Sequence, residues 1–347
     1  MPPIACGPTS VTKAYCGATE ISKGYCGSNL FFSSFVNMPI PIRSAVTSVN
    51  NDSGGLIFGG WPINNDTYSF SVANNLVRSE LLTPVNPPAA RYDAAMAGSV
   101  TNGVMFGGVT TSAQADFYTY SVANGIITWV RPTHTSTTAR SGHRIVGTRA
   151  SGLIFFGNSG SNELGNVLRY VRQSNGNYTF SSLPSYGNVY SYQRRRSHFG
   201  IAGDTSAGII FGGRRSGNLL NDFIRYTATS SRITWARPSL SGVRPAVRRQ
   251  MGVAGTATQG VIFGGRSSSS ARYNDAYSYS VSGNTVTVRR LTASGTISAR
   301  GSFAMMGTSA TAGFVWGGSG RPAPNNLFVR YAVSGSTITW TTLQYAT

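Results

Sequence analysis

The chain has little lysine, acid, histidine or cysteine, and it has no long apolar run. Its 347 residues include ten acids, three histidines and three cysteines, and its only lysines are Lys13 and Lys23. No stretch of eighteen apolar residues occurs, and the start is not a charged segment followed by an apolar one. We therefore expect neither a membrane span nor a secretory signal. Helix signals are nearly absent too, which favours an all-β protein.

The local patterns of common catalytic and metal sites are also missing. There is no close cysteine pair and no histidine near a cysteine, so a zinc site is not expected. A nucleophile elbow, paired catalytic carboxylates and a phosphate-binding glycine loop are not visible. We therefore predict a protein that is not an enzyme and has no catalytic residues, no metal and no cofactor.

Glycine, by contrast, is abundant, and much of it lies in a repeat. An arginine is followed by a glycine seven residues on, by another five later, and then by an aromatic residue and a Gly-Gly doublet. Each unit is about fifty residues long and contains four short segments that alternate apolar and polar residues, which is typical of strands and of propellers or solenoids. We call the six starting residues the framing arginines: Arg43, Arg91, Arg140, Arg196, Arg248 and Arg300.

The repeat resembles the kelch repeat, whose pattern opens with Arg-Ser-Gly-His and continues with a Gly-Gly, a Tyr and a later Trp. Residues 140–143 match that opening in full, and the resemblance covers residues 43–343. It implies an all-β, six-bladed propeller with an N-terminal extended arm. Residues 30–35 read as an outer strand that either closes the ring or belongs to a seventh blade. We divide the chain into an arm of residues 1–36 and a propeller of residues 37–347.

Departures from the repeat fall in single blades. The third blade has Phe156 in place of the first doublet glycine. Asn166 and Asn326 replace an Asp that begins the third strand elsewhere, as at Asp116. Because framing arginines and these aspartates begin strands at the same end of the blade, we expect ion pairs between them. The framing arginines are thus interpreted as mostly structural.

Positive charge is concentrated in the second half of the chain. The net charge is +19, and residues 151–347 hold twenty arginines and only four acids. In a four-stranded blade the loop after the second strand and the connection to the next blade emerge on one face, so that face should attract acidic partners. The predicted partner-binding arginines are Arg194, Arg195, Arg214, Arg215, Arg244, Arg266, Arg272, Arg290 and Arg321. Specific recognition of nucleic acid is not expected, because exposed aromatics are not interleaved with the basic residues.

The first 27 residues contain a second repeat with a period of ten. Cys6, Cys16 and Cys26 each precede a glycine, and Tyr15 and Tyr25 precede the last two of these cysteines. Two interpretations remain open: small buried residues in short strands, or an assembly arm with intermolecular disulfides. The same five residues are the predicted assembly site.

Two enzyme classes have propellers of this kind. Copper radical oxidases resembling galactose oxidase need two histidines and a tyrosine linked to a cysteine, but every cysteine here lies outside the repeats. Sialidase-like propellers need an arginine triad with an acid and a tyrosine, and the Asp-box pattern of that family is missing. An oxidase or glycosidase is therefore the weakest hypothesis.

The first functional hypothesis is a structural or receptor-binding component of a virus particle, since kelch-like repeats also occur in tailed-phage structural proteins. On this view the chain resides in the virion as part of an oligomeric assembly. Its arm binds other subunits, and its arginine face binds an acidic protein or anionic surface glycans. The alternative is a soluble or extracellular propeller that binds acidic polysaccharide. An intracellular scaffold is a further possibility.

Overall fold

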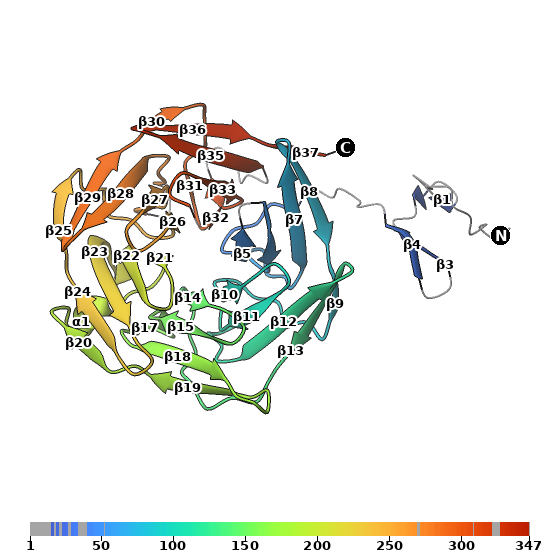
Figure 1. The fold of residues 1–347 in the computed structure, drawn as a ribbon, viewed down its shortest axis with the longest axis horizontal. Coiled ribbons are helices and arrows are strands. Elements are labelled where there is room, and N and C mark those ends of the chain that lie inside the picture. Colours follow the sequence, from blue (N-terminus) through green and yellow to red (C-terminus); the bar gives the residue numbers. More distant parts are fainter. Residues whose placement is uncertain are drawn as a thin grey trace.

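The computed structural model describes residues 40–346, apart from residues 52, 269–270, 308 and 321–326, and four short backbone segments between residues 15 and 33. Six sheets stand around a common axis as the blades of a propeller (Figure 1). Within the described residues the only helix is the four-residue α1 (Ser191–Arg194). The predicted all-β propeller is confirmed, with six blades.

Each blade has four antiparallel strands, which follow one another in chain order from the axis outward. Blade 1 has β5 (Thr47–Asn51), β6 (Gly54–Phe58), β7 (Thr67–Ala73) and β8 (Leu76–Leu81). Blade 2 has β10 (Ala95–Gly98), β11 (Asn102–Phe106), β12 (Phe117–Ala123) and β13 (Ile126–Val130). Blade 3 has β14 (Arg144–Gly147), β15 (Ser151–Phe155), β18 (Val167–Arg172) and β19 (Tyr178–Ser182).

The second half of the ring repeats this order. Blade 4 has β21 (Gly200–Gly203), β22 (Ala207–Arg215), β23 (Asn218–Ala228) and β24 (Ile233–Ala236). Blade 5 has β26 (Gly252–Gly255), β27 (Gln259–Phe263), β28 (Ala276–Ser282) and β29 (Thr285–Arg290). Blade 6 has β32 (Ala304–Met306), β33 (Ala312–Trp316), β35 (Phe328–Ser334) and β36 (Thr337–Thr342).

A short parallel strand covers the outer edge of five blades, and a single bridge covers that of blade 3. The chain leaving blade 1 forms β9 (Thr83–Val85) on β13, and β20 (Ser185–Gly187), β25 (Ser239–Gly242) and β30 (Thr292–Ser294) do the same on β24, β29 and β36. On blade 3, His134 bridges Tyr178. Such covering removes unpaired edge groups that invite aggregation.

The C-terminal strand closes the ring. β37 (Gln344–Tyr345) pairs with β8 of blade 1, and the amide of Ala346 donates to the carbonyl of Val77 at 2.8 Å. The sequence offered residues 30–35 either for this role or for a seventh blade, but β4 (Asn29–Ser33) pairs with β3 (Lys23–Cys26) instead. The other described arm strands, β1 (Tyr15–Cys16) and β2 (Thr19–Glu20), pair with each other. Small two-stranded sheets also form between β16 (Asn158–Ser159) and β17 (Asn162–Glu163), and between β31 (Arg300–Gly301) and β34 (Ser319–Gly320).

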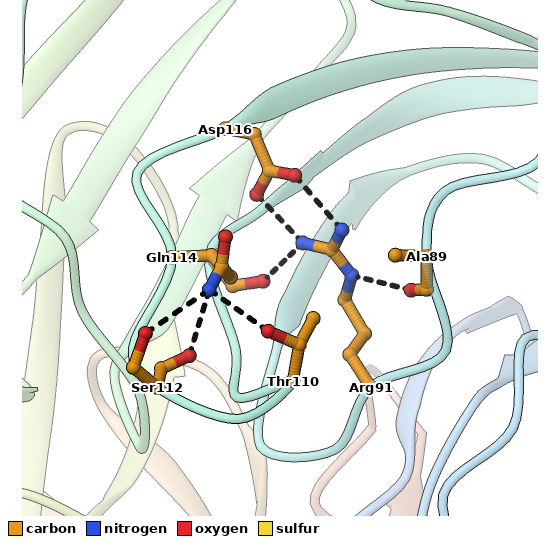
Figure 2. A network of polar contacts seen from close by, with 7 residues as sticks. Ala89, Arg91, Thr110, Ser112, Gln114 and Asp116 are labelled. Atoms are coloured by element: carbon orange, nitrogen blue, oxygen red, sulfur yellow. Dashed lines mark hydrogen bonds and ion pairs between the residues drawn. The ribbon is translucent and has the colours of Figure 1, made fainter.

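The framing arginines are buried and hold the blade ends together, as predicted. Arg91 donates to both carboxylate oxygens of Asp116 at 2.6 and 2.8 Å, to the carbonyl of Gly107 and to that of Ala89 (Figure 2). Arg196 and Arg248 pair with both carboxylate oxygens of Asp222 and Asp275 in the same way. Arg43 donates to one oxygen of Asp66 and to the side-chain oxygen of Asn64. A buried, bidentate pair of this kind fixes geometry because two parallel hydrogen bonds orient the guanidinium against the carboxylate.

Blade 3 lacks this pair. Arg140 is fully buried, donates to the carbonyl of Phe156 at 3.0 Å, and its Nη2 has no partner among the described residues. Burial lowers the pKa of Arg140 to about 10. The oxygen of Asn166, which stands where blades 1, 2, 4 and 5 have Asp, is also unpartnered among the described residues.

Phe156 adopts φ +51° in the position of the first doublet glycine. A left-handed backbone costs a non-glycine residue about 1–2 kcal/mol. The ring offsets this because it is fully buried and packs 5.5 Å from Trp235 and 5.4 Å from Phe199.

Candidate functional site

Six backbone hydrogen bonds form a closed ring around the propeller axis. Each blade contributes the residue two positions after its framing arginine, and the amide of each residue donates to the carbonyl of its counterpart in the preceding blade at 2.8–3.1 Å. All six residues have a left-handed backbone, with φ between 53° and 59°. We call this the axial ring; its members are Ala45, Asp93, Gly142, His198, Gln250 and Ser302.

Two side chains of the axial ring bind each other across a third member. Nε2 of His198 lies 3.0 Å from Oδ2 of Asp93. A Cβ on Gly142, between them in the ring, would lie 2.9–3.0 Å from three atoms of the His198 imidazole. Burial opposes ionisation of Asp93, but His198, Arg144 and Arg266 outweigh it and hold the pKa of that carboxyl below its ordinary value.

The first strands of all six blades line a central channel of about 530 Å³. Arg144 lines this channel, at a position where the other blades have Thr47, Ala95, Gly200, Gly252 and Ala304. Its Nη1 donates to the carbonyl of His143 at 3.0 Å. Burial lowers the pKa of Arg144, and the charge of Asp93 opposes that effect. The channel therefore contains a guanidinium that is compensated mainly by one carboxylate of the axial ring.

Four further arginines gather beside the axial ring. The backbone of Arg266 forms isolated β-bridges with Arg249 and with Arg272, and the backbone of Arg214 forms one with Ser197. Burial lowers the pKa values of Arg249 and Arg266, and repulsion by neighbouring arginines adds to it: by Arg214 for Arg249, and by Arg249 and Arg272 for Arg266. We call Arg144, Arg214, Arg249, Arg266 and Arg272 the arginine mouth.

The arginine mouth holds more positive than negative charge. Among the described residues two carboxylates offset it: Asp93, and Glu163, whose Oε1 lies 3.4 Å from Nε of Arg214. Four buried side-chain atoms here have no hydrogen-bond partner within the described protein: Nε of Arg249, Nε of Arg266, Nη1 of Arg272 and Oε1 of Gln250. Such a cluster can bind a carboxylate, phosphate or sulfate group.

Ser197, His198 and Asp93 contact one another in the order of a serine–histidine–aspartate triad, but the serine is not accessible to a substrate. Nδ1 of His198 lies 3.1 Å from Oγ of Ser197, and Nε2 faces Asp93. Ser197 is fully buried, so a substrate could not reach its hydroxyl without a rearrangement. No cluster of three or more potential metal ligands occurs among the described residues, and no helix there is long and apolar enough to cross a membrane.

The predicted partner-binding arginines have different environments. Arg214, Arg266 and Arg272 belong to the mouth, Arg215 is half-buried nearby, and Arg195, Arg244 and Arg290 are exposed. Arg194 is buried, donates to the carbonyl of Val189 and lies 5.4 Å from the Trp235 ring, so its role is structural. Arg321 lies outside the described residues.

The predicted assembly arm cannot be placed against the propeller. Tyr15 and Cys16 form β1, and Tyr25 and Cys26 end β3, but their side chains lie outside the described residues, as does all of Cys6. The arm's assembly role stays a prediction.

Sequence reasoning missed Asp93, Arg144, His198, Arg249 and Gln250. Each lies one, two or four residues after a framing arginine. Aligning the six units position by position would have placed Asp93, His198 and Gln250 in one layer around the axis, because equivalent positions of a propeller repeat lie at equal height.

Comparison with known proteins agrees with this architecture. A family model described as the KLHDC2/KLHL20/DRC7 Kelch-repeats domain matches residues 175–346, and 242 chains of known structure match the fold. The chain is a kelch-repeat β-propeller. This kelch propeller is similar to the solved structure of YjhT, with a TM-score of 0.68 and 12% identity over 88% of this chain and 99% of that one. That likeness shows the fold alone. No curated protein matches the kelch propeller significantly.

Proposed function

We propose that this kelch propeller is a non-enzymatic structural protein that binds an acidic protein partner through its arginine mouth. The kelch β-propeller fold itself suggests a protein-binding or structural role. The observation that supports the acidic partner is the mouth, where five arginines face two carboxylates and several guanidinium nitrogens lack a protein partner. An incoming carboxylate is attracted by this excess of positive charge, because the five arginines are partly exposed.

The propeller serves, in this proposal, as a subunit of a virus particle, with the partner another subunit. The motivation is the sequence: the resemblance to kelch-like repeats of tailed-phage structural proteins, together with the ten-residue cysteine repeat. A closed ring with covered strand edges suits a particle component, because it limits uncontrolled assembly.

Fractionation of native source material by size, followed by mass spectrometry, tests this role. We expect the chain to travel with capsid or tail proteins, and the double variant Arg249→Ala/Arg266→Ala to lose its partner while staying folded. A chain that is found only as a free monomer contradicts the particle role. A chain that stays in particles despite the double variant contradicts the role of the mouth.

A further inference from the structure

The connection between blades 3 and 4 presents three exposed tyrosines. Tyr186, Tyr190 and Tyr192 are 57%, 67% and 56% exposed. The connections that lead to Arg91, Arg140, Arg248 and Arg300, residues 82–90, 131–139, 237–247 and 291–299, contain no tyrosine. Because rings this exposed add little to the core, burial does not explain why this one connection carries them.

The connection is held firmly against blade 4. Val189 and Arg194 are buried, and Arg194 lies over Trp235. The side chain of Asn188 accepts the amide of Arg237 at 3.1 Å, and Oε1 of Gln193 accepts the amide of Tyr190 at 2.9 Å. The tyrosines are thus presented by an anchored turn, which lowers the entropy lost on binding.

Two of the rings form a parallel, stacked pair. The ring centroids of Tyr190 and Tyr192 are 6.1 Å apart and their planes differ by 6°. The exposed residues around them are small and polar, namely Ser185, Asn188 and Ser191. A protein hot spot places aromatics in a desolvated apolar pocket. An exposed ring pair among hydroxyl and amide groups suits a hydroxyl-rich ligand better.

Positive charge surrounds the rings. Arg195 and Arg237 are exposed, and Nη1 of Arg215 donates to the carbonyl of Gln193 at 3.4 Å. The carboxylates of Asp222 and Glu163 on this face are already paired with Arg196 and Arg214. The charge therefore favours an anionic ligand.

We propose that Tyr186, Tyr190 and Tyr192, with Arg195, Arg215 and Arg237, form a binding site for an acidic polysaccharide. The apolar C–H face of a sugar ring packs on a tyrosine face, and the guanidinium groups bind the carboxylate or sulfate groups of the sugar. This platform shares no residue with the arginine mouth and does not depend on the proposed protein partner.

Titration of the intact protein with oligogalacturonate and with heparin oligosaccharide tests the platform, with dextran as the uncharged control. We expect saturable binding of at least one acidic probe and none of dextran. Tyr190→Ala/Tyr192→Ala should weaken it at least tenfold, whereas Tyr190→Phe/Tyr192→Phe keeps the rings and should change it less than threefold. Trp61→Ala, which removes another exposed aromatic ring from this face, should have no effect.

The same titrations on Arg249→Ala/Arg266→Ala separate the platform from the mouth. Binding that survives in this variant and fails in the tyrosine double variant supports the platform. The platform is overturned if no acidic sugar binds, or if the tyrosine double variant leaves the binding unchanged. Neither result argues against the proposed protein partner of the arginine mouth. Capture of an acidic peptide by the tyrosines in place of sugar also overturns the platform. Unchanged melting curves confirm that the variants fold.

Discussion

The imidazole of His198 in blade 4 lies across Gly142 of blade 3 and reaches Asp93 of blade 2, with 3.0 Å between Nε2 and Oδ2. The contact joins alternate blades at the level of the closed axial ring. It also provides the carboxylate that offsets Arg144 and Arg266. Glycine at position 142 makes the contact possible, because any larger residue would occupy the space of the imidazole.

Gly142→Ala should destabilise the protein by displacing His198. Backbone strain alone does not explain this, since Ala45 adopts the same left-handed conformation in blade 1. We expect a loss of about 1–3 kcal/mol in the free energy of unfolding, as for overpacking of a filled site. Denaturant unfolding measures it. In the His198→Ala background the added methyl group should cost much less, and an equal cost there would show that His198 is not the obstacle.

Asp93→Asn should make the free energy of unfolding less dependent on pH in the acidic range. The folded-state pKa of Asp93 lies below its ordinary value of 3.8, so its ionised form stabilises the protein above that pH and the contribution disappears as pH falls through the lowered pKa. We expect the variant to be about 2 kcal/mol less stable at pH 7. The difference should shrink below about pH 4. A difference that stays constant down to pH 2 would contradict the assignment.

Asn166→Asp should stabilise blade 3. The change places a carboxylate opposite the buried and incompletely bonded Arg140, as Asp116 stands opposite Arg91. We expect a gain of about 1–2 kcal/mol at neutral pH, measured by chemical denaturation. The matched reverse change, Asp116→Asn, should cost about 3 kcal/mol because it leaves Arg91 buried without its partner. No gain in blade 3 together with a large loss in blade 2 would mean that Arg140 is compensated in another way.

Removal of residues 344–347 should open the ring. It deletes β37 and the hydrogen bond between Ala346 and Val77, so we expect a loss of about 2–3 kcal/mol from the missing backbone pairing. Removal of residues 1–36 is the control, because the predicted domain boundary places that segment outside the propeller. Equal destabilisation by both truncations would contradict closure by the C-terminal strand.

The repeat in the sequence was sufficient to predict the blades, the strand order and the framing ion pairs. These features depend on local patterns, such as the glycine doublets and the aspartates that begin third strands, and each recurs with a fixed spacing. The shared face of the loop arginines followed from the alternating strand directions. The arginine mouth did not follow in the same way, because Arg144, Arg214 and Arg249 belong to three different blades and come together only when these are arranged around one axis.

Ring closure stayed open in the sequence for a similar reason. Residues 30–35 and residues 344–345 both have strand patterning, and pairing with β8 depends on how the ends of the ring meet, which no local pattern encodes. Burial of Arg194 also escaped sequence reasoning. Its neighbour Arg195 is exposed, and only the packing of the short helix α1 over Trp235 separates the two.

Binding of a poly-glutamate peptide, followed by fluorescence anisotropy at increasing salt, tests the arginine mouth most directly. The account predicts saturable binding that weakens with salt and falls about tenfold or more in Arg249→Ala/Arg266→Ala. The control Arg172→Ala/Arg232→Ala removes the same charge from two exposed arginines at the opposite ends of the strands, and should bind almost like the unchanged protein. Equal losses in both double variants would mean that only net charge attracts the peptide, and would contradict a binding site at the mouth.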